Sequence, residues 1–332
     1  MNLTRSFRSA QGVRAMLLGA LASTVFVGAY SVLTPHPGEA EPGARPVNHR
    51  ADPAASFTTA DEGSCLNWTV NEDGVAMDFQ QTSCAEPHRF EVSAREDLAT
   101  YPSSEFGENA PRPDITRQAQ LREELCRNVT LHYLDGKLDP SGRFSVASIL
   151  PPADSWQKGD RTLLCGLQAA DSSGTLLETK GKVDQVDQAR VAQPGECLFV
   201  DSSNSLHKVE CGADHHLETT QIVDLSAQFN DHAPTVEQQD EYLKDTCTQA
   251  AIGYLGEEEK LYQSTLQPFW STISPDSWEG GSRSVNCSLV SAGEHGFNTL
   301  AGSATGEFTI NGQPPAPQPK RNPLRSEAGQ RP

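Results

Sequence analysis

Two stretches of the chain decide its fold: GSCL at 63–66 followed by CAEPHRFEV at 84–92, and GECL at 195–198 followed by CGADHHLET at 211–219. In both, a histidine lies four residues after the second cysteine, and a glutamate lies three residues after that histidine. The same pattern at two places in one chain indicates an internal duplication. We therefore predict two tandem copies of one domain of about 100 residues.

The eight cysteines fall into two sets of four with similar spacing. An even number in an exported chain indicates disulfides, and the sequence has no CxxC pair of the kind typical of a zinc ribbon. In each set the first two cysteines flank a hairpin-like segment, the third lies on a helix, and the fourth lies on a strand beneath it. Four cysteines permit three pairings, and this layout favours first with second and third with fourth. The favoured bridges are Cys65–Cys84, Cys126–Cys165, Cys197–Cys211 and Cys247–Cys287.

Each copy is expected to hold short strands around its first two cysteines, a strand after the histidine, one helix and two late strands. In the first copy the helix starts near Asp114, and its apolar residues recur at 3.6-residue spacing. In the second copy Thr235 and Gln238 form a capping box. Gly136 and Gly256 follow the helices, where a left-handed residue often ends a helix. The predicted fold class is α+β: two tandem copies of a small, mostly antiparallel sheet with one packed helix, each with two disulfides.

An uncharged run of 19 residues, AMLLGALASTVFVGAYSVL, occupies 15–33 and follows three arginines. As a helix it spans about 28 Å, close to the roughly 30 Å hydrocarbon core of a bilayer. We predict a single-pass membrane anchor at 15–33, with 1–14 in the cytoplasm and the domains outside the cell membrane. A cleaved signal peptide is the alternative, and the sequence does not decide between the two.

Composition sets the other boundaries. Residues 34–60 are rich in Pro, Ala and Gly and read as a flexible stalk. The two copies are expected at 61–170 and 194–298, joined by a polar linker at 171–193 with a strand in part of it. The Pro-rich, locally basic end, 299–332, is expected to be a disordered tail.

The charge of the chain excludes one class of partner. The 332 residues hold 26 Lys and Arg against 44 Asp and Glu, a formal net charge of −18. Binding to phosphates requires clustered basic residues, so nucleic acid is not an expected partner. The membrane is an expected partner through the anchor, and the oligomeric state is left open.

The sequence contains no GxSxG or HExxH motif, and every cysteine has a place among the predicted disulfides. We therefore predict no catalytic residue, no metal and no cofactor. His88 and His215 are expected to be structural imidazoles, hydrogen-bonded to the backbone at a turn. A joint site with the glutamate three residues later is disfavoured, because positions three apart on a strand face opposite sides.

Two short loops are candidate recognition sites. Trp156 with Arg161, and Trp278 with Arg283, lie between a proline and the fourth cysteine of each copy, beside a glycine turn. An exposed aromatic loop would suit recognition, and His88 and His215 are further candidates. The alternative is a tryptophan that covers the core beside the sheet.

The pattern Gly-x-Cys-Leu, Cys-x-x-Pro-His-x-x-Glu-Val, a helical Cys and Pro-x-x-x-Ser-Trp-x-x-Gly-Asp-Arg-x-x-x-Cys resembles the septum-formation domain of actinobacterial membrane proteins. The first copy carries it nearly complete, at Gly63, Cys65, Cys84, Pro87, His88, Glu91, Val92, Cys126, Ser155, Trp156, Gly159, Asp160, Arg161 and Cys165. The second copy departs from it at Asp214, Thr219 and Ser282. The resemblance implies a role near the septum or cell wall, with cell-division or cell-wall proteins as partners. It implies no activity, cofactor or catalytic residue.

These observations favour a non-catalytic, membrane-anchored binding or scaffold protein of the cell envelope, associated with septum formation and cell division. The alternative is a metal-dependent envelope hydrolase that uses His215 and His216.

Overall fold

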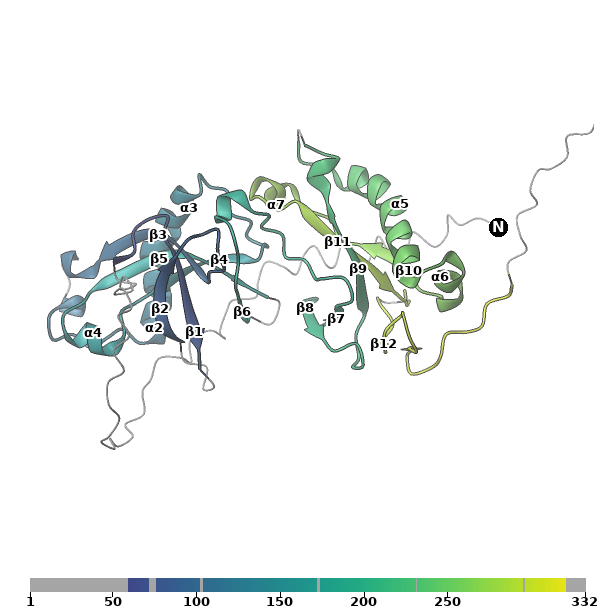
Figure 1. The fold of residues 1–332 in the computed structure, drawn as a ribbon, viewed down its shortest axis with the longest axis horizontal. Helices are drawn as coiled ribbons and strands as arrows, with labels where there is room; N and C mark the ends of the chain where they lie inside the picture. The colour runs from purple at the N-terminus through teal and green to yellow at the C-terminus, as the bar shows by residue number, and fades with distance from the viewer. Residues whose placement is uncertain are drawn as a thin grey trace, which may run out of the picture.

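The computed structural model describes residues 59–71, 76–101, 104–171, 174–230, 232–294 and 296–320, which form two units side by side (Figure 1). The predicted cytoplasmic segment and anchor, and the predicted stalk as far as residue 58, lie outside the described residues. Within the described part of the chain, no helix combines the length and the apolar character needed to cross a bilayer.

The first unit contains an antiparallel sheet in the order β2-β1-β3-β5-β4, with the short β6 paired to β5. Its strands are β1 (Cys65–Val70), β2 (Ala76–Thr82), β3 (Phe90–Asp97), β4 (Phe144–Ile149), β5 (Thr162–Ala170) and β6 (Leu176–Leu177). Its helical segments are η3 (Leu98–Thr100), η4 (Ser104–Phe106), α2 (Ile115–Leu121), η5 (Arg122–Cys126), α3 (Arg127–Tyr133), α4 (Ala153–Gln157) and η6 (Val183–Gln185).

The second unit contains an antiparallel sheet in the order β10-β11-β9-β7-β8, and the two sheets resemble two copies of one architecture. Its strands are β7 (Cys197–Val200), β8 (Leu206–Val209), β9 (Leu217–Asp224), β10 (Gln267–Trp270) and β11 (Ser284–Val290), with the separate pair β12 (Leu300–Ala301) and β13 (Thr309–Ile310). Its helical segments are η7 (Leu225–Ala227), α5 (Val236–Leu255), α6 (Glu258–Ser264) and α7 (Pro275–Glu279).

The long helices begin and end at the predicted residues. Asp114 accepts a hydrogen bond from the Arg117 amide at the start of α2, and the capping box of Thr235 and Gln238 starts α5. Gly256 ends α5 with φ of 92°. The first helix differs from the expected single element, because the five π-helical residues of η5 separate α2 from α3.

Apolar side chains of the helices lie against the sheets. Leu243 and Cys247 of α5 belong to the same buried cluster as Val285 and Cys287 of β11, and Figure 1 shows α5 along one face of that sheet. In the first unit Leu121, Cys126, Leu163 and Cys165 share a buried cluster in the same way. The third and fourth cysteines of each unit are therefore enclosed by side chains of the core.

The described residues hold four disulfides and no free cysteine, and the pairings are the favoured ones. The Cα atoms of each pair lie 5.0 to 5.2 Å apart, within the usual range for a bridge. Each bridge joins two residues of the same unit, so none of the four disulfides connects one unit to the other.

Two predicted boundaries are wrong. The expected linker at 171–193 is divided between the units: β6, η6 and the buried Val183 belong to the first, while Ala192 packs against the core of the second and bonds to Asn286. The expected disordered tail at 299–332 is ordered as far as residue 320, and Leu300 at its start is 1% exposed. Both segments are polar in sequence, and they are held mainly by backbone pairing to distant parts of their units. Composition does not reveal pairing of that kind.

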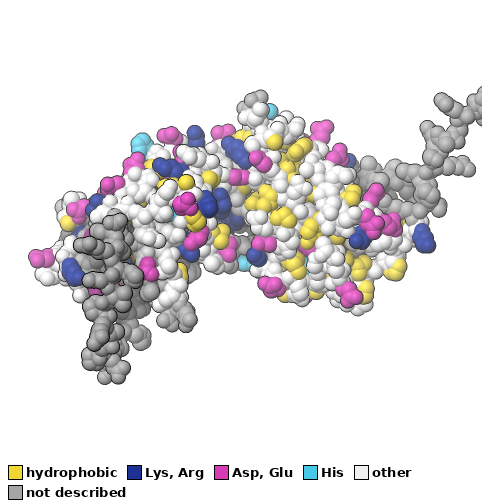
Figure 2. Space-filling view, in the orientation of Figure 1, with side chains coloured by type: hydrophobic (Ala, Val, Ile, Leu, Met, Phe, Trp, Pro, Cys, Tyr) yellow, Lys and Arg dark blue, Asp and Glu magenta, His cyan; other side chains and the backbone are white. Residues whose placement is uncertain are grey.

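The two units meet at a close junction beside α7 (Figure 1). The buried Asp139 of the first unit accepts a hydrogen bond from Ser282 of the second, and the Gln188 amide donates to Gly281 O at 3.3 Å. A Cβ on Gly280 would lie 2.6 Å from the Asp139 Cα, so only glycine permits this approach. Figure 2 shows basic side chains gathered along the junction. The units are thus fixed to one another by buried polar contacts.

Candidate functional site

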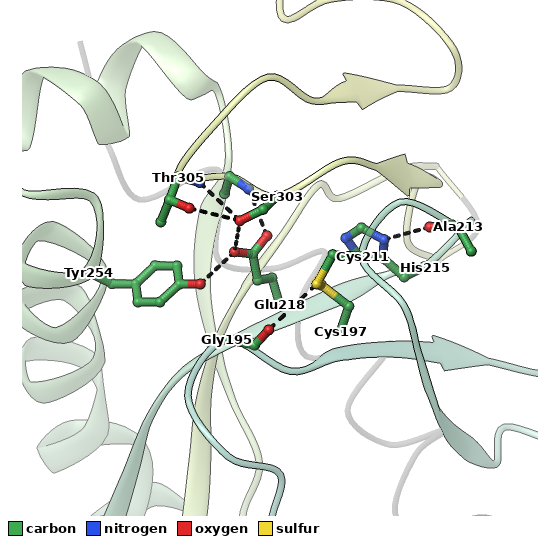
Figure 3. The surroundings of a disulfide bond; sticks show 10 residues. Gly195, Cys197, Cys211, Ala213, His215, Glu218, Tyr254, Ser303 and Thr305 are labelled. Atoms are coloured by element: carbon green, nitrogen blue, oxygen red, sulfur yellow. Dashed lines mark hydrogen bonds between the residues drawn. A yellow bond between two sulfur atoms is a disulfide. The ribbon is translucent and has the colours of Figure 1, made fainter.

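Each unit contains a buried group of one cysteine, one histidine and one glutamate, which we call the Cys–His–Glu cluster. In the second unit it comprises Cys197, His215 and Glu218, whose sulfur, nitrogen and oxygen atoms lie within 4.8 Å of one another (Figure 3). The register of the sheet places Glu218 of β9 directly opposite Cys197 of β7. Sequence reasoning disfavoured a joint site for His215 and Glu218. It was wrong because His215 precedes β9 and forms an isolated β-bridge with Leu300 instead of continuing the strand.

The first unit repeats this cluster with Cys65, His88 and Glu91. Glu91 of β3 is opposite Cys65 of β1, and all three residues are buried. Both clusters therefore arise from the same strand register and the same spacing between cysteine, histidine and glutamate.

The glutamate of each cluster is fully hydrogen-bonded. Glu218 accepts from the Tyr254 hydroxyl at 2.6 Å, the Ser303 hydroxyl at 2.7 Å and the Ala304 amide at 2.7 Å (Figure 3). Glu91 accepts from the Tyr133 hydroxyl at 2.7 Å and the Val183 amide at 2.8 Å. Such bonds offset the cost of removing a carboxylate from water.

The pKa values of the two tyrosines that donate to these carboxylates are raised. Burial, with the hydrogen bond to Glu218 and its charge, raises the pKa of Tyr254 to about 12. Burial and the hydrogen bond to Glu91 raise the pKa of Tyr133 well above its ordinary value. Both phenols therefore stay neutral donors at any physiological pH.

The histidine of each cluster is held by a backbone carbonyl. His88 Nδ1 lies 2.9 Å from Glu86 O, and His215 Nδ1 lies 2.9 Å from Ala213 O. A carbonyl only accepts, so in each ring Nδ1 carries the hydrogen. This is the turn-bound imidazole expected from the sequence.

The second ring nitrogen differs between the units. His88 Nε2 lies 3.4 Å from the Thr179 hydroxyl. His215 is 0% exposed, and its Nε2 has no hydrogen-bond partner among the described residues. A buried polar atom left without a partner costs about 1–3 kcal/mol.

The clusters offer no free ligand set for a metal while the disulfides are intact. Cys65 and Cys197 are bonded to other sulfurs, and both glutamates are occupied by protein donors. Thiolate sulfur, not disulfide sulfur, is the usual metal ligand. The arrangement thus ties strands and loops together.

His216 lies apart from its neighbour's cluster. Its Nδ1 accepts the Val200 amide hydrogen at 2.9 Å, and its ring centroid lies 4.9 Å from that of Phe199. Burial, and secondarily the nearby His215, lower the pKa of His216. The structure does not bring His215 and His216 to one site, so the hydrolase alternative has no geometric support.

The two tryptophan loops are not exposed recognition surfaces. Trp156 is 2% and Trp278 is 6% exposed, and the guanidinium carbons of Arg161 and Arg283 lie 4.1 and 4.2 Å from their ring centroids. Arg161 also donates to backbone carbonyls, including Trp156 O at 2.6 Å. The burial agrees with the reading in which each tryptophan covers the core beside the sheet, and not with an exposed aromatic loop, because rings of this size are stabilised by burying their apolar area.

Sequence reasoning missed the two segments that close the clusters, which we call the closing segments: 179–183 and 300–304. His88 and Thr179 exchange backbone hydrogen bonds at 2.8 and 3.0 Å, and His215 and Leu300 do so at 2.7 and 2.9 Å. The sequence feature that could have indicated these segments is one glycine at the centre of each, Gly181 or Gly302. The structure gives these glycines φ of 86° and 93°.

The fold and the clusters define a class: a two-unit protein of disulfide-closed antiparallel sheets with a buried Cys–His–Glu cluster in each unit. The profile of the family described as septum formation matches residues 62–287, and the chain belongs to that family.

The chain is also similar to two curated proteins. The chain is 36% identical over 327 residues to an uncharacterized membrane protein of Mycobacterium tuberculosis strain CDC 1551 / Oshkosh, and equally to one of strain ATCC 25618 / H37Rv. Each alignment covers 95% of this chain and 72% of the relative. No solved structure matches the chain.

Proposed function

We propose that this chain is a non-catalytic, membrane-anchored binding or scaffold protein of the cell envelope, associated with septum formation, and that its two units are tandem copies of one module. One observation carries the proposal: the groups that could have formed an active site are used to close each unit. The cysteines are bonded to one another, and Glu218 accepts three hydrogen bonds from its own unit.

The junction between the units supports a scaffold role. Ser282 bonds to the buried Asp139, and the Arg283 amide donates to Asp187 Oδ1 at 2.9 Å. These contacts hold two separate surfaces at a fixed relative geometry. Partners bound to both surfaces would be held at a high effective concentration relative to one another.

An extracytoplasmic location is supported from two directions. Four disulfides are typical of proteins in an oxidising compartment. The relatives are named as membrane proteins, and the family is described by septum formation. The predicted anchor at 15–33 would provide the attachment.

The first experiment tests location. The full chain should sediment with membranes, resist carbonate extraction and be digested by protease added outside intact spheroplasts. A variant lacking residues 1–33 should stay in the cytoplasm with reduced cysteines. Protease protection of the full chain in intact spheroplasts would contradict the proposal.

The second experiment tests binding. A photo-crosslinking amino acid is placed in living cells at Val70, Ile115 or Val236, all well exposed, and at the buried Ala251 as the control position. We expect the exposed positions, but not Ala251, to crosslink to envelope proteins that mass spectrometry identifies as division or cell-wall proteins. Crosslinks to lipid alone, or the same products from all four positions, would refute the scaffold role.

A further inference from the structure

The two sulfurs of the Cys197–Cys211 bridge have different surroundings. Cys197 is 0% exposed and belongs to the Cys–His–Glu cluster. Cys211 follows the edge strand β8, is partly exposed, and its sulfur lies 3.5 Å from Gly195 O. Cys211 is therefore the more exposed residue of the bridge, whereas Cys197 is enclosed.

The imidazole of His215 is oriented toward this bridge. Ala213 O holds the hydrogen on Nδ1, so Nε2 carries the lone pair, and Figure 3 shows that edge of the ring on the side of the disulfide. Nε2 is buried and has no hydrogen-bond partner in the described ranges. In the first unit the equivalent nitrogen of His88 has the Thr179 hydroxyl nearby.

We propose that Cys197–Cys211 is a thiol-exchange site for an external dithiol, with Cys211 as the attacked sulfur and His215 as the group that holds the proton beside the departing Cys197. This goes beyond the binding role proposed above, because it assigns a substrate class and a reaction to the second unit. The reaction consumes the bridge once, so the chain acts as a stoichiometric oxidant and not as a catalyst. When the bridge opens, the unpartnered Nε2 of His215 would hold the proton that balances the charge of the buried Cys197 thiolate.

The exchange is a two-electron transfer in two steps. One thiolate of the dithiol attacks Cys211 Sγ, the bond to Cys197 breaks, and Cys197 leaves with the electron pair as a thiolate. The second thiol of the reagent then attacks the reagent's first sulfur, which is bonded to Cys211 in the mixed disulfide; that bond breaks, and Cys211 leaves with the electron pair. The dithiol is oxidised to a cyclic disulfide, and its two protons pass to Cys211 and to the His215–Cys197 pair.

Several polar groups surround His215. Glu218 faces it from β9, the neutral Tyr254 hydroxyl donates to that carboxylate from α5, and Asp214 precedes it in the chain. The Glu218 oxygen, the His215 nitrogen and the Cys197 sulfur lie within 4.8 Å of one another, so a proton held on His215 would offset the charge of a new Cys197 thiolate beside the carboxylate. A thiolate next to a protonated histidine forms at a lower pH than an isolated one.

The first test uses the folded full chain. Dithiothreitol is added at neutral pH, samples are alkylated over time, and the cysteines are mapped by mass spectrometry. We expect Cys197–Cys211 to open at least about tenfold faster than the enclosed bridges Cys126–Cys165 and Cys247–Cys287. A monothiol, glutathione, should form its mixed disulfide on Cys211. Opening of all bridges together, or an adduct on Cys197, would overturn the proposal.

The second test isolates the role of His215. A Cys211→Ser variant leaves Cys197 as a single thiol, whose thiolate absorbs at 240 nm. We expect that absorbance to persist more than one pH unit below the ordinary thiol pKa of about 8.5. Adding His215→Phe should abolish this shift, while adding the matched control His216→Phe should not. If the variant that carries His215→Phe fails to fold, the titration of Cys211→Ser alone tests the proposal. A pKa of the Cys197 thiol at or above the ordinary value would then overturn it.

Discussion

Glu91 and Glu218 are carboxylates in the interior of their units, and the residues around them explain how they are tolerated. An unpaired buried charge is strongly destabilising. Each is balanced by a tyrosine hydroxyl from the helix and a backbone amide from the closing segment. The carboxylate thus links three elements that are distant in sequence, and the link depends on every partner being present.

Replacing Tyr254 by phenylalanine should destabilise the protein by about 1.5–3 kcal/mol, because the buried Glu218 carboxylate loses a charge-assisted donor. Urea unfolding followed by fluorescence measures the change. Tyr101→Phe is the matched control: its hydroxyl donates at 3.1 Å to Glu96, which is partly exposed and can bind water instead. We expect that variant to lose less than about 1 kcal/mol. Equal losses of unfolding free energy in the two variants would show that the bond to the buried carboxylate stabilises no more than the bond to the partly exposed one.

The same bond predicts a dependence on alkaline pH. A tyrosine in the unfolded chain ionises near pH 10, whereas the pKa of Tyr254 is raised to about 12 in the folded protein. The folded state binds this proton more tightly, so the stabilisation is complete below pH 10 and is lost as the pH rises toward 12. Absorbance at 295 nm should show late-titrating tyrosines that include Tyr133 and Tyr254, and Glu218→Gln should move the titration of one of them, Tyr254, part of the way toward 10. A spectrum unchanged by that substitution would refute the assignment.

At the scale of elements, the closing segments matter most. Residues 300–304 pair with His215 and place the Ala304 amide on Glu218, while the Gly302 amide donates to Cys211 O at 2.7 Å. In the first unit Gly181 donates to Cys84 O at 2.7 Å in the same way. Each closing segment therefore covers its own cluster and completes its unit.

Gly302→Ala should destabilise the second unit by about 1–3 kcal/mol, because φ is 93° there and a Cβ would lie 2.3 Å from Glu307 O. Thermal unfolding measures the loss. Gly306→Ala is the control, since the nearest atom to its Cβ would be Ser303 O at 3.8 Å. That variant should change the midpoint by little. A similar midpoint for both variants would mean that the closing segment contributes nothing to stability.

For the whole molecule, the junction decides how the two units act together. Gln188 of the first unit donates from its side chain to Lys137 O at 2.9 Å and accepts from the Asp139 amide at 3.0 Å, while its backbone amide reaches Gly281. The same residue therefore orders the loop of the first unit and bonds the second.

Gly280→Val should loosen the junction, because its Cβ would have to retreat from 2.6 Å to an ordinary contact of about 3.5 Å from the Asp139 backbone. We expect exchange of the Gln188 and Arg283 amides with deuterium to accelerate at least about tenfold, or about 1.4 kcal/mol of opening free energy. Amides within β9 should keep their protection. Gly212→Val, with no atom within 4 Å of its Cβ, serves as the control. Unchanged exchange at the junction in Gly280→Val would argue against close docking.

The covalent frame and the local elements follow from residue types and their spacing. Cysteine spacing predicted the four bridges, and capping residues such as Thr235 and glycines such as Gly256 predicted where helices begin and end. These features depend on residues near one another in the chain, or on a bond type that only cysteine makes. For that reason they can be read from residue type and spacing alone.

Long-range packing fixes which polar segments are ordered, which side chains are buried, and how the units meet. Residues 300–304 look like part of a tail, and Trp156 looks like a loop residue, yet Leu300 and Trp156 are both buried. Their positions depend on backbone hydrogen bonds and contacts between residues far apart in sequence. Since every backbone carries the same donors and acceptors, residue type does not indicate which distant segment will pair with which.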